Sequence, residues 1–267
     1  MIGGGAMQRA RARACASVFA GLLMLSATAC TRPGANDRRA DFFPLHQDDT
    51  WIYAVDRPLR NAHTRMTVRV LGERYVESLR RRCSLVDESY AANDNEIEAP
   101  SGKPEIHPIA YYRENGFLYR ALSLEYRGRE VHDVGLGSGE ERFLPDVLDR
   151  DLSWDSTTTA YDLGGGNSYG VRQTHRAVSE PSVIQVPAGR FTGCIRVDTV
   201  AVHGGKHDGE YDTHPIVLYY ADWYAPNVGL IRTIESDRPD VSVPANGPPL
   251  SQIELLAYDV EGAKSIR

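Results

Sequence analysis

The sequence IRVDTVA, residues 195–201, alternates between two kinds of side chain, because the charged residues Arg196 and Asp198 stand between apolar or small ones. Successive side chains of a β-strand point to opposite faces of a sheet, so this period of two predicts a strand that is buried on one face. The same period recurs in WIYAVD at 51–56 and in RMTVRV at 65–70. These segments indicate a sheet that covers a core with one face.

Further strand candidates are bounded by Gly, Pro, Asn or Asp, and they lie at residues 73–79, 109–114, 117–126, 169–179, 216–224, 229–235 and 253–260. The pair Asn115-Gly116 tolerates positive φ at both central positions of a tight turn, so it predicts a hairpin between two antiparallel strands. Helical signals are few. One or two helical turns are expected at residues 143–150.

The sequence therefore predicts an all-β fold, a single strongly curved antiparallel sheet with at most short helices. Such a sheet must close on itself, curl, or pack against a second layer to bury its apolar face. A half-barrel, an open barrel and a sandwich-like meander all meet this requirement. The segment 42–262 has the size of one all-β domain, and neither an internal repeat nor a linker divides it.

The N-terminal segment has the features of an export signal. Three arginines within residues 9–13 precede an apolar run that is too short to span a bilayer comfortably. The sequence ATAC at 27–30 then resembles the cleavage site of bacterial lipoproteins, which implies that residues 1–29 are a signal peptide and that Cys30 is lipidated. The same ATA also suits an ordinary signal peptidase, which would release a soluble periplasmic or secreted protein.

The mature chain is expected to have three parts. Residues 30–41 are polar and form the lipidated cysteine with a flexible tether, 42–262 form the antiparallel β domain, and 263–267 form a tail. The resemblance to lipoproteins also implies sorting to the outer membrane, facing the periplasm, because Thr31 rather than Asp follows the cysteine.

The net charge of the chain argues against nucleic acid as a partner. The formal net charge is −6 at pH 7, and removal of residues 1–29 takes away three arginines and no acid, which leaves a charge of −9. A domain of this charge does not attract nucleic acid or anionic lipid through its net charge. Membrane attachment is therefore expected through the N-terminal lipid anchor.

Two cysteines remain once the signal is removed and Cys30 carries lipid. Cys83 and Cys194 are an even number of thiols in an oxidising compartment, so a disulfide between them is possible. The alternative is two separate buried thiols, because a sequence does not give the Cα separation that a bridge requires.

Several segments, in order, resemble a large group of bacterial proteins that carry export signals and have poorly known functions. They are FPL at 43–45 with WIY at 51–53, FLP at 143–145 with Trp154, VPAGRF at 186–191 with CIRV at 194–197, and WYAPNVGLI at 223–231. The resemblance implies a strongly curved antiparallel sheet, similar in outline to periplasmic carriers that hold acyl chains in a concave face. The residues themselves predict turns, because Pro187 and Pro226 preset φ while Gly189 and Asn227 suit the later turn positions.

Residues that would carry chemistry are sparse. His203, His207, Asp208 and His214 offer metal-binding groups within one Gly-rich loop, but no spacing there fixes a tetrahedral site, and a solvated loop is the simpler interpretation. The sequence GLGSGE at 135–140 matches neither a dinucleotide loop nor a nucleophile elbow. We therefore expect no catalytic residue, no metal and no cofactor.

These observations lead to one function hypothesis and two alternatives. The chain is expected to be a lipid-anchored envelope protein that faces the periplasm and acts as a non-catalytic binding or scaffold module, with an envelope protein or an apolar ligand as its partner. The first alternative is a periplasmic carrier of an apolar or acyl ligand in a concave sheet. The second is a metal-dependent hydrolase that uses the loop at 203–214.

Overall fold

The computed structural model describes residues 40–91, 108–121, 124–127, 130–133, 140–161, 168–180, 183–204, 206–207, 210–211, 215–239 and 247–265. Arg39–Arg267 form one compact unit. This unit is slightly larger than the predicted domain at 42–262, because Asp41 bonds to Arg113 and a short strand at Ala263–Lys264 pairs with the sheet.

The described residues are almost entirely strands. In chain order these are β1 Thr50–Arg57, β2 Ala62–Val76, β3 Arg81–Tyr90, β4 Ile109–Glu114, β5 Phe117–Ala121, β6 Leu124–Arg127, β7 Glu130–Asp133, β8 Glu141–Pro145, β9 Ser153–Tyr161, β10 Ser168–Ser179, β11 Ile184–Val186, β12 Gly189–Phe191, β13 Ile195–Gly204, β14 Lys206–His207, β15 Glu210–Tyr211, β16 Ile216–Ala225, β17 Gly229–Ser236, β18 Ser251–Val260 and β19 Ala263–Lys264. A single 3-10 turn, Pro58–Arg60, is the one helical element in this part of the chain.

All strand pairs in these residues are antiparallel. The main sheet has the order β8-β5-β4-β3-β2-β1-β18-β17-β16-β13-β10-β9, and β19 pairs with β18. Three separate hairpins, β6–β7, β11–β12 and β14–β15, complete the fold. The first and last long strands, β1 and β18, are therefore neighbours in the middle of the sheet.

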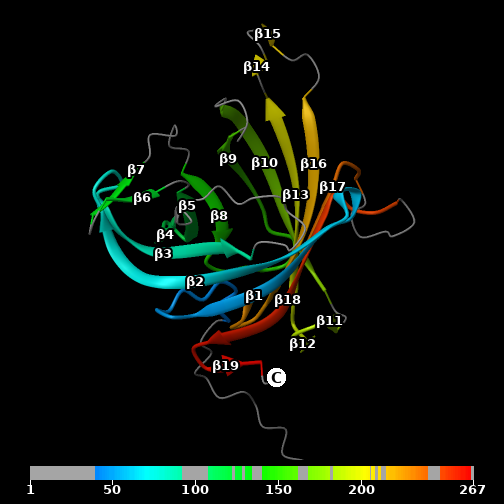
Figure 1. Cartoon of the computed structure of the whole chain (residues 1–267), viewed down its shortest axis with the longest axis horizontal. Helices are drawn as coiled ribbons and strands as arrows, with labels where there is room; N and C mark the ends of the chain where they lie inside the picture. Colours follow the sequence, from blue (N-terminus) through cyan, green and yellow to red (C-terminus); the bar gives the residue numbers. More distant parts are fainter. Residues whose placement is uncertain are drawn as a thin grey trace, which may run out of the picture. The chain divides into compact units, whose positions relative to one another are not determined.

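The connection between β8 and β9 requires the sheet to curl. These strands lie at opposite ends of the sheet order, but only residues 146–152 separate them along the chain. A flat sheet of this order would place them about 50 Å apart, whereas the connection spans at most about 28 Å. The two edges must therefore approach each other, and Figure 1 shows the resulting curvature, with β10, β13 and β16 standing across the direction of β1, β2 and β3. The predicted all-β, strongly curved antiparallel sheet is confirmed.

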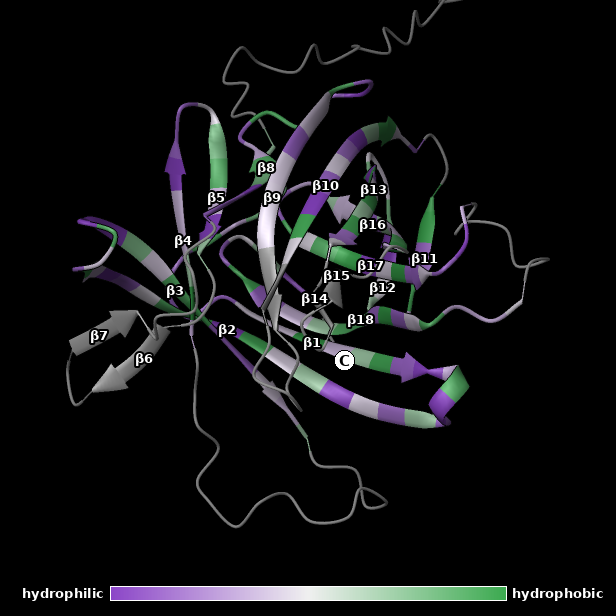
Figure 2. Cartoon of the chain, turned by 90° about the horizontal axis from the view of Figure 1, so that it is seen from above, coloured by the Kyte–Doolittle hydropathy of each residue, from purple (hydrophilic) through white to green (hydrophobic). Residues whose placement is uncertain are grey.

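Adjacent residues in the strands pack into different clusters. On β3 and β4, Val86 and Tyr111 belong to the main core on the concave side, while Leu85 and Tyr112 belong to a smaller cluster on the outer side. Figure 2 shows the same period as alternating hydrophilic and hydrophobic bands along strands such as β2 and β10. The period of two in the sequence thus corresponds to burial on both faces of this part of the sheet.

The predicted turns are present. Asn115 and Gly116 have φ of 51° and 79° and join β4 to β5. Asn227 and Gly229 have φ of 59° and 99° and join β16 to β17. The segment at 186–189 reverses the chain between β11 and β12.

Three element predictions were wrong. Residues 143–150 do not form helical turns, because Glu141–Pro145 is strand β8, hydrogen-bonded along β5. The segment 73–79 is not a separate strand, since β2 continues through a bulge near Gly72 as far as Val76. The strand expected at 117–126 ends at Ala121, and Leu124–Arg127 pairs elsewhere, with β7.

Candidate functional site

The concave face of the sheet encloses two adjoining chambers. The larger has a volume of about 300 Å³ and is lined by residues from six strands: Arg120, Glu141, Phe143, Leu144, Gln173, His175, Val197, Thr199, Tyr220, Asp222, Tyr224, Leu230 and Thr233. The smaller has a volume of about 100 Å³ and a mainly apolar lining that includes Trp51, Tyr53, Met66 and Glu88. Arg120, Phe143 and Leu230 line both chambers, so the two spaces share a wall.

Arg120 and Glu141 form an ion pair at this wall. They are cross-strand partners on β5 and β8, which places both side chains on the concave face. Nε and Nη2 of Arg120 lie 2.8 Å and 2.6 Å from Oε2 of Glu141, and the guanidinium stacks 4.8 Å from the ring centre of Phe143. Glu141 keeps only 2% of its side chain accessible, whereas Arg120 keeps 26%. The guanidinium therefore remains accessible from the chambers that it lines.

Asp222 is a carboxylate without a cationic partner among the described residues. It lies on β16 opposite Thr233 of β17, whose hydroxyl donates a hydrogen bond of 2.6 Å to Oδ1. Burial raises the pKa of Asp222 from 3.8 to about 6, although the Thr233 hydrogen bond and the charge of Arg120 act in the opposite direction. The cost of burying the charged form is therefore only partly offset by its neighbours.

The raised pKa of Asp222 makes the stability of the fold depend on pH, and we expect Asp222→Asn to remove this dependence. A raised carboxyl pKa stabilises the fold fully below pH 3.8, and the contribution is lost as the pH rises through about 6. At pH 8 the variant should therefore be more stable than the unmodified chain by about 1–3 kcal/mol, and the two should converge at low pH. Urea unfolding across this pH range measures the difference, and an equal pH dependence in both proteins would contradict the prediction.

A second polar group, on β9, β10 and β13, surrounds His175. Thr199 Oγ1 lies 2.8 Å from Nδ1, Ser156 Oγ lies 2.9 Å from Nε2, and the Ser156 hydroxyl donates to Gln173 Oε1 at 2.8 Å. Because the Ser156 proton is used in the bond to Gln173, Nε2 carries a proton and donates to Ser156, and in a neutral imidazole Nδ1 then accepts from Thr199. Burial lowers the pKa of His175 to about 4, and the charge of Arg120 acts in the same direction. The imidazole is therefore held neutral near pH 7.

Three buried polar atoms on the concave face of the same strands lack a hydrogen-bond partner within the described residues. They are Trp154 Nε1, Thr158 Oγ1 and His203 Nε2. The sheet register aligns Thr158 and His203 with Val171 between them, on the face that carries Ser156 and Thr199. Buried polar atoms normally have partners, so these three mark the inner face as a place where a polar group or water would be bound.

The N-terminal segment closes one end of the concavity. Phe43 packs with its ring centre 5.2 Å from that of Tyr111 and 5.3 Å from that of Phe143. Trp51 is buried and its Nε1 donates to the carbonyl of Val228 at 2.7 Å. The segments FPL, WIY and WYAPNVGLI, which are distant in the sequence, thus meet at this end.

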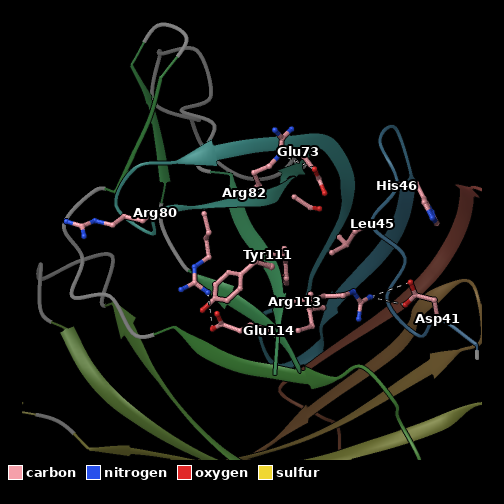
Figure 3. Close-up of a pocket in the computed structure, with 13 residues that line it drawn as sticks. Asp41, Leu45, His46, Glu73, Arg80, Arg82, Tyr111, Arg113 and Glu114 are labelled. Atoms are coloured by element: carbon pink, nitrogen blue, oxygen red, sulfur yellow. Dashed lines mark hydrogen bonds and ion pairs between the residues drawn. The ribbon is translucent and has the colours of Figure 1, made fainter. Parts of the chain in front are cut away.

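A groove of about 610 Å³ lies on the other side of this segment, next to the β2–β3 turn (Figure 3). Leu45 and Tyr111 line both the groove and the smaller chamber, so the N-terminal segment separates the two spaces. The remaining lining is mostly charged: Asp41, His46, Glu73, Arg80, Arg81, Arg82, Arg113 and Glu114, with Ser84, Tyr112 and Leu118. Figure 3 shows Arg113 facing Asp41 on one side, Arg82 next to Glu73 on another, and Arg80 directed away from the groove. We call this space the arginine groove.

The cysteines and histidines named from the sequence are not brought together. Cys83 and Cys194 are free and buried, one in the outer cluster and one in the main core, and burial raises the pKa of each thiol to about 11. The two cysteines are thus separate buried thiols in this structure, which is the second of the two possibilities given by the sequence. Cys30 lies outside the described residues.

The metal candidates named from the sequence lie in different places. His203 lies on the concave face of β13, and burial lowers its pKa. His207 lies on β14, while Asp208 and His214 lie outside the described residues. Within the part of the chain that the structure describes, no group of three or more metal-ligating side chains is present.

Arg120, Glu141 and Asp222 are not among the residues predicted from the sequence. Two of them carry a signal that was available: Arg120 is the one charged residue of β5 (FLYRA), and Asp222 is the one charged residue of β16 (IVLYYADWYA). A single charge within an otherwise apolar strand indicates either a solvent-facing position or a buried polar site. The strand register is needed to decide between them.

Known proteins offer a comparison of fold. No family model matches the sequence, and no curated relative is detected. The chain resembles the crystal structure of a candidate lipoprotein from Parabacteroides distasonis ATCC 8503, with 20% identity, a TM-score of 0.53, and coverage of 82% of this chain and 99% of that chain. A candidate exported protein with a YmcC-like fold from Bacteroides fragilis NCTC 9343 has 16% identity, a TM-score of 0.48 and the same coverage. The first likeness shows that the two chains share a fold.

Proposed function

We propose that this chain is a lipid-anchored protein of the bacterial envelope that binds a small amphipathic cation in the concavity of its sheet, without catalysing a reaction. The cationic end of the ligand lies near Asp222, and the apolar end lies in the smaller chamber. This replaces the purely apolar or acyl ligand expected from the sequence, because the larger chamber contains ionisable groups.

The envelope location is supported by the export signal and Cys30 in the sequence. The neighbour of shared fold is itself described as a candidate lipoprotein, which agrees with this location. No helix among the described residues has the length and apolar character needed to cross a bilayer. Attachment through acyl chains at Cys30 accounts for membrane association in this proposal.

The class of ligand is inferred from the charged residues that line the two chambers. Glu88, Glu141 and Asp222 are lining carboxylates, whereas Arg120 is the one lining guanidinium. Arg120 is already bonded to Glu141, and although its charge also lowers the pKa of Asp222 and Glu88, neither carboxylate forms an ion pair with a described cation. Burial raises the pKa of Asp222, and a cationic ligand would lower this cost by supplying the missing partner.

Binding without catalysis is supported by the arrangement around His175. A serine nucleophile is activated when its hydroxyl donates to a neighbouring base. Here the Ser156 hydroxyl donates to Gln173 instead, and the imidazole donates to Ser156. Thr199 rather than a carboxylate contacts the other imidazole nitrogen. This geometry stabilises the sheet interior and leaves Ser156 unactivated.

Titration with hexylamine, hexanol and hexanoate tests the ligand class. The three probes share an apolar chain and differ in charge, so hexylamine should bind most tightly in isothermal titration calorimetry at pH 8. Asp222→Asn should weaken hexylamine binding by about tenfold or more, because the variant removes the unpaired charge. Binding of hexylamine should also weaken as the pH falls below about 6, since Asp222 then becomes neutral.

Asp155→Asn is the matched control. Asp155 lies on β9 next to Ser156 but on the opposite face, where it is exposed and accepts a hydrogen bond from Thr174. Hexylamine binding should be unchanged in this variant. Equal affinities for hexylamine and hexanoate, or equal losses in Asp222→Asn and Asp155→Asn, would refute the cation proposal.

A further inference from the structure

We propose that the arginine groove and the adjoining β2–β3 turn face the membrane and contact the phosphate groups of phospholipids. The inference rests on the proposed lipid anchor at Cys30, but it concerns a surface that the ligand chambers do not use. Three independent observations carry it: where the chain enters the domain, how charge is distributed along the turn, and which side chains the turn exposes.

The chain enters the domain at the groove. Asp41 lines the groove, where Nη2 of Arg113 lies 3.1 Å from its Oδ1, and its backbone NH bonds to the side chain of Asn227. The ten steps from Cys30 to Ala40 span at most about 35 Å even when fully extended. An acyl chain on Cys30 therefore holds the bilayer surface within reach of the groove.

The turn has a charge opposite to that of the chain. Residues 73–82 contain four arginines and two glutamates, a net charge of +2, whereas the whole chain has −6. Arginine is well suited to phosphate because its planar fork of donors matches the phosphate oxygens. The turn next to the tether is thus a locally basic part of an acidic chain.

The arginines differ in how far they are neutralised. Arg81 lies 3.0 Å from Glu114 and Arg82 lies 3.4 Å from Glu73, whereas no ion pair to a described residue holds the exposed side chain of Arg80. Arg80 adopts a left-handed backbone, with φ of 50°, at the end of the turn. Figure 3 shows its side chain projecting outward, away from the groove. It is therefore free to bind a phosphate outside the domain.

The turn also exposes an aromatic residue of the type found at membrane interfaces. Tyr75 is 53% exposed and is the cross-strand partner of Arg82. Tyrosine has an apolar ring and a polar end, so it suits the boundary between headgroups and acyl chains. The carboxylates of Glu73 and Glu114 would at the same time accept hydrogen bonds from the ammonium of a zwitterionic headgroup.

A tryptophan reporter tests the orientation. The acylated full chain with Tyr75→Trp is reconstituted in vesicles of phosphatidylethanolamine and phosphatidylglycerol that carry brominated acyl chains, which quench nearby indole rings. We expect loss of most of the fluorescence of the added tryptophan. The native Trp51, Trp154 and Trp223 are buried and supply the background, which is measured on the unmodified chain.

Leu59→Trp is the matched control, because Leu59 is 65% exposed in the turn at the other end of the long strand β2. Its fluorescence should survive in the same vesicles. Adding Arg80→Glu and Arg82→Glu to Tyr75→Trp should restore most of the lost fluorescence, since the phosphate contacts are then repelled.

The outcomes separate this inference from the proposed anchor. Intact mass first reports whether Cys30 carries acyl chains, and an absent adduct would overturn both the anchor and the membrane-facing groove. With the adduct present, equal quenching of the two reporters would overturn the orientation and leave the anchor intact. Quenching at residue 75 that persists after both charge changes would overturn the role of the arginines.

Discussion

Arg120→Leu should lower the free energy of unfolding by about 3–5 kcal/mol at pH 7, because it leaves a buried carboxylate without its cation. Glu141 retains only 2% of its side-chain accessibility in the intact pair, so its carboxylate depends on the guanidinium rather than on water. Both bonds from Arg120 to Oε2 of Glu141 disappear together with the stacking on Phe143. Urea unfolding followed by circular dichroism measures the change.

Two variants identify the cause. Glu141→Gln leaves Arg120 charged, but Arg120 is 26% accessible from the chambers and can be hydrated there, so the loss should be smaller than for Arg120→Leu. The double change Arg120→Leu with Glu141→Leu removes both charges and should recover much of the stability. A double variant as unstable as Arg120→Leu alone would show that lost packing, rather than the unpaired charge, sets the cost.

Trp51→Ala should cost about 3–5 kcal/mol of unfolding free energy, the range typical of a large buried aromatic residue. Trp51 is 5% exposed and holds the N-terminal segment against the turn between β16 and β17. Its Nε1 lies 3.6 Å from the position that a Cβ would take at Gly229, so the turn backbone approaches the ring closely. Loss of the ring opens a cavity at this junction.

Trp51→Phe separates the ring from its hydrogen bond. The phenyl ring fills most of the space but leaves the Val228 carbonyl without its donor, so a smaller loss of about 1–3 kcal/mol is expected. Urea midpoints for the two variants provide the measurement. If Trp51→Ala lost less than Trp51→Phe, the junction would not depend on the volume of the ring, contrary to this account.

Strands whose inner face is apolar could be predicted from the sequence. Segment 195–201 and its neighbours alternate because one face packs in the core, and the turns at Asn115 and Asn227 require residues that tolerate positive φ. β9, with the sequence SWDSTTTAY, was missed because its inner face carries Ser156 and Thr158, which line a polar interior rather than an apolar one. The pattern that identifies a strand is thus weakest where the concavity is polar.

The chambers themselves depend on register and closure. Arg120 and Asp222 are far apart in sequence and lie on strands from opposite halves of the sheet order, so no local spacing connects them. They line one chamber because the sheet curls. Curling follows from the short link between β8 and β9, whose importance emerges only when the strand order is known.

The position of β1 beside β18 has a consequence for biogenesis. Strands β1–β8 emerge first during synthesis, and β1 then presents unpaired NH and CO groups until the strand at Ser251–Val260 arrives. An exposed strand edge of this kind invites pairing with other chains. Nascent molecules should therefore need a chaperone until β1 and β18 have paired.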